Sequence, residues 1–347
     1  MVNREVIRIK ALQQAYAYYM NGGKNIDVAE RELLFSLSKT YDLYNYLLAL
    51  IVALTGWARK QAERGAAAGD EEANARFLNN QFEMQLETNR ELNDFIESHG
   101  DIWTDNHAEV LRSLYRQLSA SELFRDYRES DDDSYDDDRE FWRKAYRTFI
   151  EGNDDIDAAL EDECIFWNDE RPIVDTFVVK TIKRFDPHAH TRQQLLPEYD
   201  SDEELDFARR LFRAAIHNAD EYKTYMEEAV RNWDLNRLAF MDVLVLQLAI
   251  AEMLTFPSIP VSVTINEYVD LAKSYSTPKS GKFVNGMLDT IARHLIATGR
   301  LLKKMDNARA DDTPAETPAD NDDTTPHKEE APAEGGDSKE ESENQQQ

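Results

Sequence analysis

Apolar residues recur at intervals of three and four along most of the chain, the spacing of one face of an α-helix. Near the N-terminus Ile7, Ala11 and Ala15 follow this spacing until Gly22 ends it, which predicts a helix over residues 3–20. The same criterion predicts helices over 28–64 (one long helix or two), 73–97, 107–124, 141–150, 156–166, 173–185, 205–226, 238–254, 263–275 and 280–299. The pattern therefore predicts an all-α protein.

Polar and turn-forming residues mark the ends of several of these segments. Ser201 with Glu204 forms a capping-box motif, Ser280 can cap the last helix, and Gly299 can end it. The aspartate-rich run at 130–138 is typical of a solvated loop, and residues 188–200 are predicted to form a linker. No repeat of fixed period is present.

Composition agrees with a helical protein that has a substantial core. The chain has 347 residues, of which 41% are hydrophobic, and only 12 Gly and 10 Pro, which is few turn residues for a β or parallel α/β fold. A single cysteine, Cys164, excludes an internal disulfide and favours a reducing cytoplasm. The apolar segment 43–57 is too short to cross a bilayer, so we expect no membrane partner.

The charge of the chain is strongly segregated. The formal net charge is -28, of which residues 306–347 contribute -11 through 14 acidic and 3 basic residues. Residues 271–304 carry +6 and residues 1–20 carry +2, which leaves -25 on residues 21–270. The basic segments permit a local anion-binding surface on an otherwise acidic protein.

Motifs for catalysis or for metal and nucleotide binding are missing or incomplete. The run from Lys279 to Lys282 is not a phosphate loop, because Ser276 and Phe283 stand where that motif needs Gly and Ser or Thr. The aspartate run lacks the glycine of a calcium loop, and the pair His188 and His190 lacks further metal ligands. We therefore expect no enzyme activity, no catalytic residues, no metal and no cofactor.

The last third of the chain carries a specific succession of motifs. It consists of Trp233-Asp234-Leu235-Asn236-Arg237-Leu238, Met241-Asp242, Leu248-Ala249-Ile250-Ala251-Glu252-Met253, Ile259-Pro260, Ile265-Asn266-Glu267, Leu271-Ala272-Lys273-Ser274-Tyr275 and Lys282-Phe283-Val284-Asn285-Gly286-Met287-Leu288-Asp289. This succession resembles the transcription antitermination factor NusB, and Arg8, Ala11, Gln13 and Tyr16 resemble the first helix of that family. The resemblance covers residues 3–20 and 201–304.

The resemblance implies a NusB-like helical bundle with an additional helical region inserted after the first helix. By the same resemblance the protein would be an RNA-binding factor in transcription antitermination on ribosomal RNA operons. Its partners would be boxA-type single-stranded RNA, ribosomal protein S10 (also called NusE) and the RNA polymerase antitermination complex. Whether the protein also forms a homodimer is left open by the sequence. The partner-binding residues implied are Tyr16 and Asp242.

The residues supply a physical reason for RNA binding near residue 280. The free amides at a helix N-terminus can bind phosphate, and lysines beside them add positive charge. Aromatic rings can stack on unpaired bases. The candidate RNA-binding residues are Arg4, Arg8, Lys10, Tyr275, Lys279, Lys282 and Phe283. Each has a structural alternative: the two aromatic residues can belong to the core, and the cations can be an ordinary solvated face.

The chain departs from short family members in two segments. We divide it into the first bundle helix (1–20), an additional helical region (21–200), an RNA-binding core (201–304) and a disordered acidic tail (305–347). The acidic additions support a second hypothesis, a protein-interaction scaffold in transcription or ribosome biogenesis that has lost RNA binding. We do not expect an RNA methyltransferase with a NusB-like domain, because that class needs a downstream cofactor-binding α/β domain and here an acidic tail follows.

Overall fold

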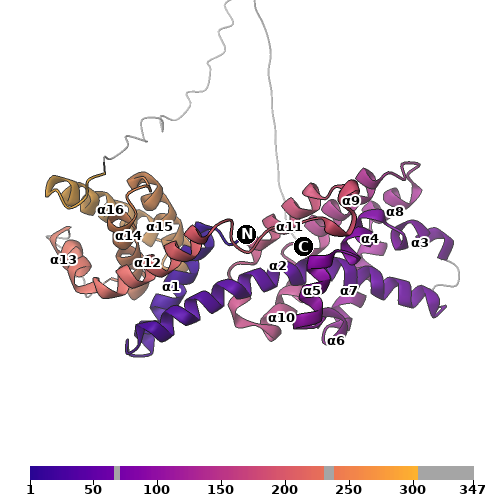
Figure 1. The fold of residues 1–347 in the computed structure, drawn as a ribbon, viewed down its shortest axis with the longest axis horizontal. Helices are drawn as coiled ribbons and strands as arrows, with labels where there is room; N and C mark the ends of the chain where they lie inside the picture. Colours follow the sequence, from indigo (N-terminus) through magenta and orange to yellow (C-terminus); the bar gives the residue numbers. More distant parts are fainter. Residues whose placement is uncertain (66–70, 230–237, 304–347) are drawn as a thin grey trace, which may run out of the picture. The chain divides into compact units, whose positions relative to one another are not determined.

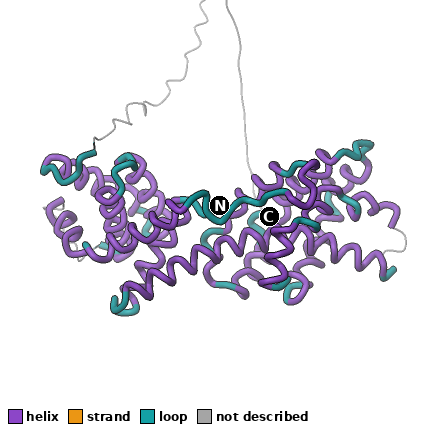
Figure 2. Tube along the Cα trace, in the orientation of Figure 1, coloured by secondary structure: helices purple, strands orange, loops and turns teal. Residues whose placement is uncertain are grey.

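The computed structural model describes residues 1–65, 71–229 and 238–303. Within these ranges the chain consists of helices and loops without any strand, as Figure 2 shows, so the all-α prediction is confirmed. None of the helices described is long and apolar enough to span a membrane. The described helices belong to one compact unit, Met1–Asp306, and the predicted acidic tail lies outside the described residues.

Among the described residues, six helices form the NusB-like bundle, five of them from the C-terminal part of the chain after residue 201 (Figure 1). They are α1 Arg4–Met20, α12 Asp202–His217, α13 Ala219–Ala229, α14 Phe240–Thr255, α15 Val261–Tyr275 and α16 Ser280–Ala297. The predicted capping box at Ser201 and Glu204 is present, and Gly299 has the positive φ of a helix-ending glycine. Ser280, by contrast, is the first residue of α16, and its hydroxyl is buried beside Thr277.

The apolar helix α14 is the centre of this bundle, as its sequence predicted. An unbroken run of its residues from Leu244 to Met253 is buried, and α1, α12, α13, α15 and α16 all pack against it. A helix that is apolar on all sides must be surrounded to remain out of water. The remaining bundle helices, which are amphipathic, therefore place their apolar faces against α14.

In the inserted region, the residues that the structure describes form ten α-helices and three short turns of other helix types. They are α2 Ile26–Glu63, α3 Glu71–Leu78, α4 Gln81–Glu87, α5 Arg90–His99, α6 Ile102–Asp105, α7 Ala108–Ser119, α8 Glu122–Glu129, α9 Tyr135–Ala145, η1 Tyr146–Ile150, α10 Asp154–Glu163, η2 Ile165–Trp167, α11 Arg171–Arg184 and η3 Pro187–Arg192.

Helix α2 connects the bundle with the inserted helices. It is one continuous helix of 38 residues that packs against α1 and α12 and also against α4, α5, α6, α7 and α11. At 1.5 Å per residue its axis extends over about 57 Å. Its buried side bonds to distant segments, since the Tyr46 carbonyl accepts from Trp103 Nε1 at 2.7 Å and Tyr44 shares a hydrogen bond of 2.7 Å with Thr181.

Capping side chains divide several segments that the apolar spacing had predicted as single helices. Asn80 and Asn89 accept hydrogen bonds from the amides of Glu83 and Leu92, so the predicted helix over 73–97 is three helices, α3, α4 and α5. Ser121 separates α7 from α8 in the same way. A capping side chain accepts a hydrogen bond from the free amides of the new helix, which lowers the free-energy cost of interrupting a helix at that point.

The prediction that the aspartate-rich run at 130–138 forms a solvated loop was only partly correct. Ser134 caps α9, so Asp136, Asp137 and Asp138 occupy its first turn, where carboxylates are favoured by the helix dipole. Asp138 is buried and accepts hydrogen bonds from the Tyr127 hydroxyl at 2.5 Å and the Gln81 amide at 2.7 Å. The run therefore starts a helix and secures it to α4 and α8.

The buried cap Asn80 yields a test of this arrangement. Its side chain is fully buried and donates to the Tyr127 hydroxyl at 2.8 Å, in addition to capping α4. We expect Asn80→Ala to lower the free energy of unfolding by about 2–3 kcal/mol, because it removes a cap and leaves buried polar groups unpaired. The exposed cap Asn25→Ala is the control, with an expected loss of about 1 kcal/mol in urea denaturation. Equal losses in the two variants would contradict this account.

Candidate nucleic-acid interface

The predicted RNA-binding residues fall into two groups in the structure. Lys279, Lys282 and Phe283 lie at the start of α16, while Arg4, Arg8 and Lys10 lie on α1. Tyr275 is the last residue of α15. Their environments differ in burial and in pairing, which decides what each can bind.

Arg8 is buried in an ion-pair network and does not extend a basic surface. Its Nε and Nη2 donate to the two carboxylate oxygens of Glu252 at 2.8 and 2.9 Å, and its Nη1 donates to Glu267 at 2.9 Å. Glu252 also accepts from the hydroxyls of Thr264 at 2.9 Å and Tyr268 at 3.2 Å. Burial alone would lower the pKa of Arg8, but the hydrogen bonds and charge of Glu252 outweigh it and raise the pKa.

Lys10 is also buried, on the side of α1 that meets the inserted region. It is 1% exposed, its Nζ lies 2.7 Å from Glu170 Oε1, and it donates to the Phe166 carbonyl at 2.6 Å. Burial lowers the pKa of Lys10 and raises the pKa of Glu170, and their mutual attraction opposes both shifts. The prediction that Arg8 and Lys10 enlarge a basic surface is therefore wrong, since both cations are neutralised inside the protein.

Arg4 keeps part of its side chain in solvent. Its guanidinium lies over the buried Phe207 ring, 5.1 Å from the ring centroid, a cation–π geometry. Of the three α1 cations, Arg4 alone is not buried.

A cleft beside α1 is acidic where the sequence predicted a basic face. It has a volume of about 470 Å³ and its lining includes Glu5, Asp169, Glu267, Asp270 and Tyr275. Gln13 donates to Asp169 at 2.6 Å, and burial together with the charges of Asp169 and Glu170 raises the pKa of Tyr275. Tyr275 is half-buried against this acidic cleft, which disfavours an approaching phosphate.

The start of α16 is, by contrast, an exposed cationic helix end. Lys279 and Lys282 are exposed and α16 runs for 18 residues, so its free N-terminal amides carry a positive partial charge. Phe283 is half-buried and packs against the core. We call Lys279, Lys282 and Phe283 the α16 start.

A third lysine, which the sequence analysis did not select, lies beside the α16 start. A Cβ added to Gly281 would lie 2.7 Å from Lys273 Cγ, so the absence of a side chain there lets the stem of Lys273 cross α16. Lys273 is exposed and pairs with Asp270 at 2.6 Å. Gly281 was the signal in the sequence that could have indicated this contact. Helices disfavour glycine, so a glycine in the first turn suggests that another side chain packs closely against the helix there.

The predicted partner-binding residues also differ in exposure. Tyr16 is 41% exposed and its ring lies 5.9 Å from that of Phe240, which is 39% exposed. Asp242, in the first turn of α14, is 5% exposed, and its Oδ1 has no hydrogen-bond partner among the described residues. Tyr16 can therefore meet a partner directly, whereas Asp242 is not on the open surface.

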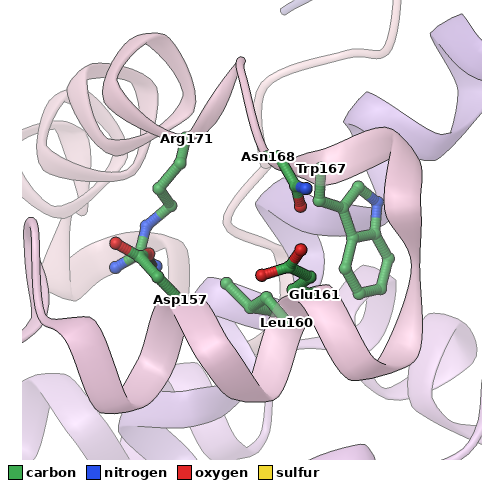
Figure 3. Close-up of a pocket in the computed structure, with 6 residues that line it drawn as sticks. All are labelled: Asp157, Leu160, Glu161, Trp167, Asn168 and Arg171. Carbon is green, nitrogen blue, oxygen red and sulfur yellow. Dashed lines mark hydrogen bonds and ion pairs between the residues drawn. The ribbon is translucent and has the colours of Figure 1, made fainter.

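A second, smaller pocket lies in the inserted region (Figure 3). It measures about 180 Å³ and is lined by Asp157, Leu160, Glu161, Trp167, Asn168 and Arg171. Arg171 donates to Asp157 at 2.5 Å, Asp175 at 2.9 Å and the Ile150 carbonyl at 2.6 Å. Each of its three guanidinium nitrogens donates one of these hydrogen bonds, so the cation of this pocket is already neutralised by Asp157 and Asp175.

Comparison with known proteins agrees with the resemblance seen in the sequence. The model of the NusB family matches residues 176–293. The match begins within α11 and ends at residue 293, in the second half of α16, so it includes the α16 start.

Three relatives, each named transcription antitermination protein NusB, give the extent of the similarity. The protein of Salinibacter ruber is 41% identical over 98 residues, which are 28% of this chain and 61% of the relative. That of Chloroherpeton thalassium is 41% identical over 98 residues, 28% of this chain and 46% of the relative. That of Thermotoga maritima is 44% identical over 86 residues, 25% of this chain and 61% of the relative. This chain thus spans about half to three-fifths of each relative, and no solved structure matches it significantly.

The burial of Arg8 gives a second testable prediction. Arg8→Ala leaves Glu252 charged and unpaired in the bundle, and we expect it to lower the free energy of unfolding by about 3–5 kcal/mol. Arg4→Ala, on the same helix, should cost no more than about 1 kcal/mol by denaturant titration. The double variant Arg8→Met with Glu252→Leu should recover part of the loss, because it removes both charges. If Arg8→Ala left the free energy of unfolding unchanged, the proposed role of the buried ion pair in stability would be refuted.

Proposed function

We propose that this protein binds boxA-type single-stranded RNA through the α16 start and acts with NusE in transcription antitermination on ribosomal RNA operons, within the RNA polymerase complex and in the cytoplasm. The observation that carries the proposal is the exposed cationic end of α16 inside the segment that matches the NusB family. The relatives' name supports antitermination as the process. The RNA class and NusE come from the resemblance alone.

The chemistry of the α16 start suits an unpaired strand. Backbone amides and two lysines can hold phosphates, and the half-buried Phe283 offers an aromatic ring to a base whose neighbours have been splayed apart. Lys273 adds a third cation nearby. Charge–phosphate contacts position the strand, while ring contacts require bases that are not paired, which favours single strands over duplex.

A scaffold that has lost RNA binding is the second candidate, and one observation favours it. Two of the three α1 cations are neutralised by Glu252, Glu267 and Glu170, and the cleft beside them is acidic. If those cations are needed for affinity, the α16 start alone would hold RNA weakly. Replacing the exposed lysines should weaken RNA binding if the first candidate is correct, and should have no effect on function if the protein is a scaffold.

The RNA proposal is tested on the full chain by fluorescence anisotropy with a boxA-type oligonucleotide, with and without NusE, over a range of salt concentrations. Lys279→Gln with Lys282→Gln removes two phosphate contacts, so the slope of log affinity against log salt should fall by about 1.4, at about 0.7 per contact for single strands. The control is Arg112→Gln with Arg125→Gln, two exposed cations of α7 and α8. RNA binding that is absent, or identical in both variants, would favour the scaffold.

Partner binding is tested separately at Tyr16. Exposed aromatic side chains supply much of the binding energy of protein interfaces, and we expect Tyr16→Ala to weaken NusE binding by at least tenfold in calorimetry. Phe35→Ala is the matched control, since Phe35 is 52% exposed on α2. If Tyr16→Ala left the affinity for NusE unchanged, or if both variants lost the same affinity, the proposal that Tyr16 lies on the partner-binding face would be refuted.

A further inference from the structure

A second exposed cluster of cations lies in the inserted region, which is acidic as a whole. Residues 139–150 and 171–184 contain eight cationic and two acidic residues, although residues 21–270 carry -25. The segments are residues 139–145 of α9 with η1, and α11, and they pack against each other. The first turn of α9, with Asp136, Asp137 and Asp138, precedes them. Neither the sequence motifs nor the family resemblance had singled out this concentration of positive charge.

Three hydrogen bonds fix the two segments antiparallel. Arg139 donates to the Phe185 carbonyl at 2.8 Å, Tyr146 to Asp175 at 2.5 Å, and Arg171 to the Ile150 carbonyl at 2.6 Å. This register places the turn of Lys144 beside that of Lys180, and Arg147 beside Thr176. We call the exposed residues Lys144, Arg147, Lys180, Lys183 and Arg184 the α11 cationic face.

The two acidic residues of this region are already engaged. Asp175 is buried and accepts from Arg171 at 2.9 Å. Glu140 accepts from Arg143 at 2.6 Å, and this hydrogen bond, followed by the charges of Arg143, Lys144 and Lys183, lowers the pKa of Glu140. Among the described residues, Arg147, Lys180, Lys183 and Arg184 form no ion pair within 4.0 Å, whereas Lys144 lies 4.0 Å from Glu140.

The surface lacks the apolar centre of a protein-binding site. Large hydrophobic side chains are exposed elsewhere in the described chain, for example at Phe35 and Ile165, but not in residues 139–150 or 171–184. Protein interfaces are organised around buried aromatic and aliphatic anchors, whereas contact with a phosphate backbone needs only correctly placed cations. The composition of the face thus favours nucleic acid over a protein.

We infer that the α11 cationic face is a second RNA-binding surface, which holds the phosphate backbone of a strand without reading its bases. This inference rests on the proposed RNA-binding function, and it gives the inserted helices a role. The face contains three cations within two turns of α11, so a strand that lies along it can form about three phosphate contacts.

The test uses full-length protein and a single-stranded RNA of about 40 nucleotides, several times the roughly 4–16 nucleotides that a single binding module covers. In Lys180→Gln/Lys183→Gln/Arg184→Gln the slope of log affinity against log salt should fall by about 2. The matched control, Arg112→Gln/Arg125→Gln/Lys223→Gln, makes the same change in net charge at exposed residues. Its slope should equal that of the wild type, and thermal melting by circular dichroism verifies that both variants are folded.

The outcomes separate this inference from the function on which it rests. If the Lys279/Lys282 variant lowers the slope and the α11 variant does not, the second surface is refuted while RNA binding at the α16 start stands. If neither variant differs from its control, both proposals fall. A reduction of equal size in the triple control would show that net charge alone is responsible, and would also refute the α11 cationic face.

Discussion

Helix α1 is held by two buried ion pairs that point to different parts of the protein. Arg8 pairs with Glu252 and Glu267 of the bundle, and Lys10 pairs with Glu170 of the inserted region. Two positions apart on a helix, the side chains leave on nearly opposite sides, at roughly 200°. Because an unpaired buried charge is very costly, the bundle and the inserted helices cannot move away from α1 separately. This constraint accounts for one compact unit where the sequence segments differ so much in composition.

The same constraint redistributes the charge available for binding. Arg8 and Lys10, which the sequence assigned to an RNA surface, instead form ion pairs inside the protein, and the cleft beside α1 is lined by acidic residues. Positive charge remains exposed at the α16 start and on α9 and α11. Local pairing, rather than the net charge of -28, therefore decides where a polyanion can approach.

The inserted helices depend on a different principle from the bundle. The bundle surrounds one apolar helix, α14, whereas the inserted helices are mostly short and begin at polar caps such as Asn80, Asn89 and Ser121. The long helix α2 supplies the surface against which many of them pack. Short helices that start at caps can turn repeatedly around one long helix, which places α11 and α9 side by side with their cations outward.

The sequence alone determined what depends on neighbouring residues: helical content, the capping box at Ser201, the buried character of α14, and the family segment that contains the α16 start. Tertiary structure decided what depends on distant partners. Arg8 meets Glu252 across 244 positions, and Lys10 meets the Phe166 carbonyl across 156, so no local pattern distinguishes these buried cations from exposed ones such as Lys282. Periodicity reports which face of a helix is apolar, but the partner of a charge is chosen by the packing of whole helices.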